Sequence, residues 1–144
     1  MFRGSYVTQI DEKFRLKVPA DFKRHIDEEY GTQFFITSKD GKRAEIFPMK
    51  AWLEKEEKMK AVSDLNPAKK RYMEMTSYYG QVVEMDAAGR LLMPQKLREA
   101  ASLTEEVVVI GMQTTLAVEN HEKLKPTIVP MTAEELKALE ELGL

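Results

Sequence analysis

Residues 11–24, DEKFRLKVPADFKR, recur in altered form at residues 86–99, DAAGRLLMPQKLRE. The matched positions are Asp11 with Asp86, Arg15 with Arg90, Leu16 with Leu91, Pro19 with Pro94, and Phe22 with Leu97. Self-similarity at a fixed spacing is typical of chains built from one repeated unit, here of about 70–75 residues. The repeat predicts two units, 1–80 and 81–144.

Each copy predicts a turn between two strands. In the first unit, SYVTQI is rich in β-branched and aromatic residues, and LKV after Arg15 alternates apolar and polar side chains. Asp11 and Asp86 fit the first turn position, where a carboxylate accepts backbone N–H bonds. Gly89 supplies the positive φ that such turns need. Phe14 stands where Gly89 does, so the first turn either has a different geometry or uses Phe14 as an apolar contact.

A short helix and a second hairpin are predicted after each turn. Pro19 and Pro94 lack a backbone donor and end their strands, and proline's fixed φ suits the first turn of a helix. Apolar residues recur four apart in these helices, as Phe22 with Ile26 and Leu97 with Ala101. The apolar runs at 32–38 and 105–111 then begin hairpins that turn near 39–42 and 111–114.

Further helices are predicted between the units and at the C-terminus. Residues 48–62 carry an apolar stripe that includes Trp52, and Asn66 followed by Pro67 is an N-cap signal for a helix through 79. Thr132 and Glu135 form a capping-box pattern ahead of LKALEELG, which is either a short amphipathic helix or a frayed tail. Together these elements predict an α+β fold that is mainly β.

Composition excludes several classes of function. The chain has 144 residues, no cysteine and two histidines, so neither a disulfide framework nor thiolate or zinc chemistry is expected. It also lacks a phosphate-cradling glycine-rich loop and a nucleophile elbow. No apolar run approaches the roughly 18 residues of a membrane span. We therefore expect no enzyme, cofactor, metal, small-molecule substrate or membrane partner.

Positive charge is concentrated in the first half of the chain. The net charge is −2, but residues 1–80 carry 16 Lys and Arg against 13 Asp and Glu, whereas residues 81–144 carry 6 against 11. An anionic partner is therefore expected to meet the first unit. From this distribution of charge we expect Arg3, Lys13 and Lys17, which lie close to the first turn in sequence, to take part in that contact.

The ordered set of motifs resembles the MraZ family of bacterial transcriptional regulators. It comprises MFRGSY at the start, D-x-x-x-R with LKVP, IF-P-x-x-W at 46–52, then D-x-x-x-R with LLMP, and VVVIG. The resemblance spans nearly the whole chain. It implies two tandem swapped-hairpin units of the AbrB-like type that form an intertwined β-barrel with flanking helices. The chains are expected to assemble into a homo-oligomeric ring.

The resemblance also implies sequence-specific binding to double-stranded DNA. The expected targets are short direct repeats upstream of the division and cell-wall gene cluster, including the protein's own promoter. In the family the Asp-x-x-x-Arg element is associated with the DNA-binding face, which puts Arg15 and Arg90 at DNA and makes Asp11, Asp86 and Gly89 turn-positioning residues. The expected location is the cytoplasm, at the nucleoid.

An oligomeric protein-binding module of the antitoxin-like swapped-hairpin type is the main alternative. The tail LKALEELGL leaves it open, because an amphipathic terminal helix often packs on a partner. The second copy lacks the Ile-Phe-Pro and Trp of the first, so the two outer helices are not expected to be equivalent.

Overall fold

The computed structural model describes residues 1–144, and the same order of elements occurs in both halves of the chain. The first half contains β1 (Ser5–Gln9), β2 (Arg15–Lys17), α1 (Ala20–Glu29), β3 (Gln33–Thr37), β4 (Ala44–Pro48), α2 (Met49–Lys60) and α3 (Pro67–Tyr79). The second half contains β5 (Gln81–Glu84), β6 (Arg90–Leu92), α4 (Gln95–Ala100), β7 (Glu106–Met112), β8 (Thr115–Asn120), α5 (His121–Leu124), the 3₁₀ helix η1 (Lys125–Thr127) and α6 (Ala133–Glu141).

The strands form two antiparallel sheets that exchange partners between the halves. The larger sheet has the order β1-β7-β8-β4-β3-β5, and the smaller one pairs β2 with β6. Thus β1 of the first half lies against β7 of the second, while β5 of the second half lies against β3 of the first. If each strand is replaced by its counterpart in the other half, the strand order of the larger sheet is the same, read from its opposite edge. The fold therefore has an internal approximate twofold axis.

The predicted first hairpin differs from this arrangement. Strands β1 and β2 are joined by the expected turn, but between them only an isolated bridge links Ile10 and Leu16. Both strands pair with strands of the other half: β1 pairs with β7, and β2 pairs with β6. Alternating apolar residues indicate which face of a strand is buried, but they do not indicate which strand it pairs with. The sequence therefore favoured pairing between the two strands that are neighbours in the chain.

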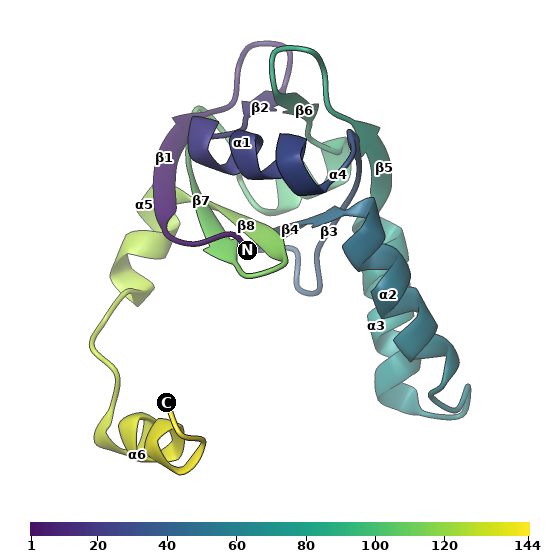
Figure 1. The fold of residues 1–144 in the computed structure, drawn as a ribbon, viewed down its shortest axis with the longest axis vertical. Helices are drawn as coiled ribbons and strands as arrows, with labels where there is room; N and C mark the ends of the chain where they lie inside the picture. The colour runs from purple at the N-terminus through teal and green to yellow at the C-terminus, as the bar shows by residue number, and fades with distance from the viewer.

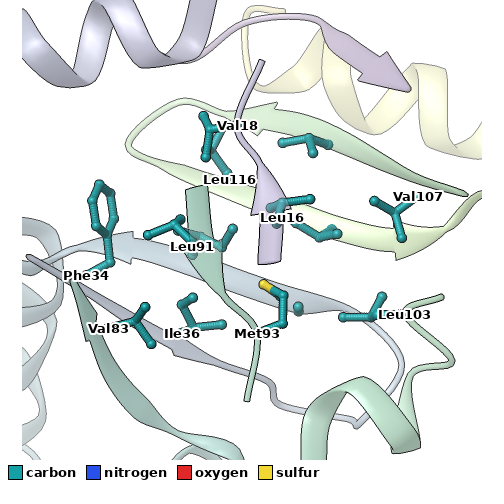
Figure 2. Close-up of a cluster of buried hydrophobic side chains, with 14 of the residues drawn as sticks. Leu16, Val18, Phe34, Ile36, Val83, Leu91, Met93, Leu103, Val107 and Leu116 are labelled. Carbon is teal, nitrogen blue, oxygen red and sulfur yellow. The ribbon is translucent and has the colours of Figure 1, made fainter. Parts of the chain in front are cut away.

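The core lies between the β2–β6 ribbon and the six-stranded sheet (Figure 2). Leu16 pairs with Leu91 at the centre of the ribbon, and both side chains are fully buried. Their neighbours in this cluster come from both halves of the chain, among them Val18, Phe34, Ile36, Met93, Val107 and Leu116. Because each half contributes to one shared core, the burial of either half depends on the other.

Helices α1 and α4 cover this core at equivalent places in the repeat. Phe22 and Ile26 of α1 are buried, as are Leu97 of α4 and Ala101 just after it. The predicted helical spacing of these four side chains is confirmed.

Helices α2 and α3 extend away from the sheets as a pair (Figure 1). Trp52 of α2 is buried at their base, where its ring stacks on Phe35 with centroids 4.4 Å apart. The side chain of Asn66 accepts hydrogen bonds from the amides of Ala68 and Lys69, which confirms the predicted N-cap. The counterpart of α2 in the second half, α5, has only four residues, so the expected inequality of the outer helices is also confirmed.

The C-terminal tail is helical. Thr132 and Glu135 make the two reciprocal bonds of a capping box, and α6 follows. Figure 1 shows α6 set apart from the rest of the chain on an extended segment. No residue of α6 is buried, and Leu136 is 54% exposed.

A mixed α/β architecture with antiparallel strands is confirmed, and closure of the sheets into a barrel stays a prediction. None of the helices combines the length and apolar character needed to cross a bilayer.

Candidate nucleic-acid interface

The first turn, residues 11–15, is organised by the carboxylate of Asp11. Its Oδ1 atom accepts the backbone N–H groups of Lys13 at 2.9 Å and Arg15 at 3.0 Å. The turn is closed by the Asp11 amide, which donates to the Arg15 carbonyl at 3.0 Å, and by the Phe14 amide, which donates to the Asp11 carbonyl at 2.9 Å. Asp11 thus binds its own turn's amides, as its place in the motif predicted.

The second turn, residues 86–90, repeats this pattern. Asp86 Oδ1 accepts the amides of Ala88 at 3.0 Å and Arg90 at 2.9 Å. The Asp86 amide donates to the Arg90 carbonyl at 3.0 Å, and the Gly89 amide donates to the Asp86 carbonyl at 3.0 Å. The two Asp-x-x-x-Arg elements are therefore one structural device used twice.

Each aspartate also fixes the arginine of its own turn. Arg15 Nε and Nη2 both lie 2.9 Å from Asp11 Oδ2, and Arg90 Nε lies 2.9 Å from Asp86 Oδ2. Only one edge of each guanidinium is engaged in this way, and the side chains are 26% and 35% exposed. An arginine held along one edge keeps its other N–H groups for a phosphate or a guanine.

The two turns lie side by side. The Val18 amide donates to the Gly89 carbonyl, and the Met93 amide donates to the Phe14 carbonyl, both at 3.0 Å. Arg15 Nη1 also approaches Asp86 Oδ2 at 3.9 Å. Figure 1 shows both turns projecting from the same end of the molecule, above β2 and β6.

The outward face of the β2–β6 ribbon continues this surface. Leu16 and Leu91 point into the core, so the alternate residues face outward: Arg15 and Lys17 from β2, Arg90 and Leu92 from β6. The cross-strand pairs on this face are Arg15 with Leu92 and Lys17 with Arg90. Three cations therefore stand together on one short ribbon.

Phe14 and Gly89 adopt the same backbone conformation. Phe14 has φ 64° and Gly89 has φ 77°, so both lie in the left-handed region. Of the two sequence-based alternatives, a different turn geometry is wrong, and the ring does make a contact, but with a cation rather than with an apolar side chain. The Phe14 ring is 48% exposed, and the Arg98 guanidinium lies over it, 3.7 Å from the centroid.

Two residues near the turns were missed by the sequence reading. Arg98 covers Phe14, and the aliphatic part of Lys23 covers Gly89, where an added Cβ would lie 2.6 Å from Lys23 Cδ. Positions 23 and 98 are separated by the same 75 places as Arg15 and Arg90. The repeat alignment of 11–24 with 86–99 already places Lys23 opposite Arg98, but their contacts with the turns are not visible in the sequence.

Of the predicted cations, Lys13 and Lys17 lie on the turn and the ribbon, and both are exposed. Arg3 does not lie with them. Its backbone lies against Gly111, next to the bridge between Phe2 and Gln113, and β1 separates it from Asp11. The structure therefore groups Arg15, Arg90, Lys13 and Lys17 but not Arg3.

Hydrogen bonding holds both aspartates in their charged form. The backbone N–H of Arg15 is the main cause that lowers the pKa of Asp11 below its ordinary 3.8, and the backbone N–H of Arg90 does the same to the pKa of Asp86. In both cases desolvation opposes the shift, and the arginine side chain adds to it. The carboxylates are thus charged near neutral pH, where they can hold the arginines.

These shifts predict a loss of stability in acid. A carboxylate whose pKa is lower in the folded state stabilises the protein above its unfolded pKa, and this contribution is lost as pH falls through the folded value. We expect the parent to melt at a higher temperature than an Asp11→Asn, Asp86→Asn double variant near neutral pH, with the gap narrowing as the pH falls below 3.8, the ordinary pKa of these carboxyl groups. Thermal melts followed by circular dichroism would measure this, and a gap that does not change with pH would contradict it.

The chemistry that this surface supports is binding of anions. No group of three or more His, Cys, Asp or Glu side chains is arranged to hold a metal ion. The two carboxylates are occupied by their turns, whereas the arginine edges and the lysines face outward. Such a surface suits a polyanion with regularly spaced charges, such as the DNA backbone.

Comparisons with known proteins agree with this chemistry. The model of the family described as "MraZ protein, putative antitoxin-like" matches residues 1–74 and 80–122. A protein of Acidobacterium capsulatum named Transcriptional regulator MraZ is 58% identical, with all of both chains covered. One from Koribacter versatilis is 48% identical over the same full extent, and one from Moorella thermoacetica is 35% identical over 82% of this chain and 80% of its own. Both carry that same name.

Proposed function

This chain belongs to the MraZ family, and on that basis we propose that it is a DNA-binding transcriptional regulator whose two Asp-x-x-x-Arg turns contact the operator. The observation that carries the proposal is the pairing of the turns, which sets Arg15 and Arg90 on one face with their guanidinium groups already ordered. Ordered arginines lose less conformational entropy on binding a phosphate or a guanine.

The operator we propose consists of short direct repeats, called operator boxes below. They lie upstream of the division and cell-wall gene cluster, including the promoter of this protein's own gene. In this proposal the protein acts in the cytoplasm at the nucleoid, and the first unit, with its excess of positive charge, meets DNA more strongly than the second.

We also propose an assembly that suits repeated boxes. The units 1–80 and 81–144 would close their sheets into one intertwined barrel, and several chains would form a ring. A single chain carries few cations at its turns and a net charge of −2 overall, so it would bind DNA weakly. Identical faces on a ring raise affinity through effective concentration, without new contacts.

The experiment that tests this proposal is a gel-shift titration with the DNA immediately upstream of the gene. We expect a sequence-specific shift that DNA of the same composition in scrambled order does not give. Binding to the scrambled DNA with equal affinity would contradict sequence-specific recognition.

The number of operator boxes should control affinity. Because each additional box engages another face of the same ring, DNA with three boxes is expected to bind about a hundredfold more tightly than DNA with one. The comparison is made by gel shift at fixed salt and equal DNA length, with the other two boxes scrambled. Equal affinities would overturn the argument from multivalency.

A further inference from the structure

The backbone of the two turns has an internal twofold symmetry. Leu16 pairs with Leu91 at its centre, and the hydrogen bonds on either side are reciprocal, from Val18 to Gly89 and from Met93 to Phe14. A DNA-binding surface with twofold symmetry binds a box equally well in two opposite orientations. Direct repeats, in contrast, are read in one direction only. A chain that reads them needs side chains that break the symmetry.

Those side chains lie on the turns themselves. The first turn carries Glu12, Lys13 and Phe14 between its Asp and Arg, and the second turn carries Ala87, Ala88 and Gly89. Glu12, Lys13, Ala87 and Ala88 are all exposed, so the two turns share a backbone and differ in charge, size and shape.

The largest difference is between Phe14 with Arg98 and Gly89 with Lys23. Arg98 holds its guanidinium 3.7 Å from the centroid of the exposed Phe14 ring, and its Nε lies 3.4 Å from the Met93 carbonyl. Gly89 is buried under the aliphatic part of Lys23, whose Nζ donates to Asp27 at 2.8 Å. The first turn therefore presents an aromatic ring backed by an ordered arginine, and the second presents no side chain at this place.

We propose that Phe14 and Arg98 set the direction in which the chain lies on an operator box, with the first turn at the base-reading end and the second turn on the sugar-phosphate backbone. This rests on the proposed function, because it assumes that the turns contact DNA. An exposed aromatic ring packs on thymine methyl groups and sugars, and an arginine stacked on a ring is ordered before it binds. Neither contact is available at the second turn.

A fixed direction also agrees with the proposed assembly. Chains related by the rotation axis of a ring all point the same way around it, as direct repeats do along DNA. If the two turns carried the same side chains, each face of the ring would accept its box in either direction.

Directed cleavage of DNA tests the proposal, because the chain has no cysteine and accepts a single reactive one. Glu12→Cys and Ala87→Cys place a thiol at equivalent positions of the first and second turns. Each variant is labelled with an iron chelate that cleaves nearby DNA and is bound to a three-box operator. We expect each label to cleave one side of every box, and the two labels to cleave opposite sides.

A transplant of the second turn into the first removes the asymmetry. The variant Glu12→Ala, Lys13→Ala, Phe14→Gly, Arg98→Lys copies DAAGR and the lysine that covers it, and glycine accepts the φ of 64° that Phe14 holds. In this background the Ala87→Cys label is expected to cleave both sides of each box, with the ratio of the two sides falling from at least about tenfold to about twofold or less. Glu57→Ala with Lys60→Ala, an exposed ion pair on α2, is the control that should keep one-sided cleavage.

The possible outcomes separate the two proposals. Two-sided cleavage by the Cys variants of the otherwise unchanged chain, or one-sided cleavage that survives the transplant, would overturn the role of Phe14 and Arg98 while leaving DNA binding in place. If the unlabelled protein protects no box from nuclease, the proposed function fails and this inference fails with it.

Discussion

Replacing Arg15 with alanine is expected to lower the affinity for operator DNA at least about a hundredfold while leaving the fold intact. One arginine paired with a guanine contributes roughly 1–3 kcal/mol, and the loss recurs at every box that a ring engages. The turn should survive the change, because Asp11 Oδ1 is held by the backbone N–H groups of Lys13 and Arg15, which alanine keeps. Gel shift measures the affinity, and circular dichroism checks the fold.

Two comparisons sharpen this experiment. Arg71→Ala removes the same charge from α3, where the side chain is 69% exposed, and should leave affinity within about twofold of the parent. Arg15→Lys keeps the charge without the planar fork, so it should retain salt-dependent binding and lose discrimination between operator and scrambled DNA. Operator binding by Arg15→Ala as tight as that of the parent would refute the assignment of Arg15.

Leu16→Ala is expected to destabilise the protein by about 2–5 kcal/mol. Its side chain is fully buried at the centre of the β2–β6 ribbon, where it meets Leu91, so truncation leaves a cavity between the two halves. Leu91→Ala should cost a similar amount, because the two leucines occupy equivalent places. Urea unfolding at two protein concentrations measures the change and separates it from any effect on assembly.

The matched control is Leu65→Ala, the same truncation at a side chain that is 92% exposed. It should change the free energy of unfolding by less than about 0.5 kcal/mol. A cost below about 1 kcal/mol for Leu16→Ala would show that the shared core does not hold the halves together.

Local signals in the sequence predicted much of the fold. Asn66 and Thr132 begin helices because their side chains bind free amides, and Asp11 and Asp86 organise turns for the same reason. These interactions join residues at most four apart, so a pattern of residue types suffices to predict them. The repeat then transferred each prediction from one half to the other.

Long-range pairing could not be predicted in the same way. Ser5 pairs with Ile110 rather than within a local hairpin, and nothing in the alternation of SYVTQI identifies that partner. The stacking of Arg98 on Phe14 depends on the same exchange, because it joins the fourth helix to a turn of the other half. The positive φ of Phe14 could not be predicted from residue type either, because this conformation favours glycine. Contacts made in the folded chain hold Phe14 in it.

The exchange of strands between the halves delays strand pairing during synthesis. The ladder that joins Ser5 to Ile110 means that β1 leaves the ribosome roughly 100 residues before its partner strand, a delay of about 5–20 s at 5–20 residues per second. Throughout that interval β1 is a strand without a ladder, and for most of it Leu16 lacks Leu91 to pack against. Until β7 has emerged, the nascent chain therefore carries an open strand edge that can pair with another chain.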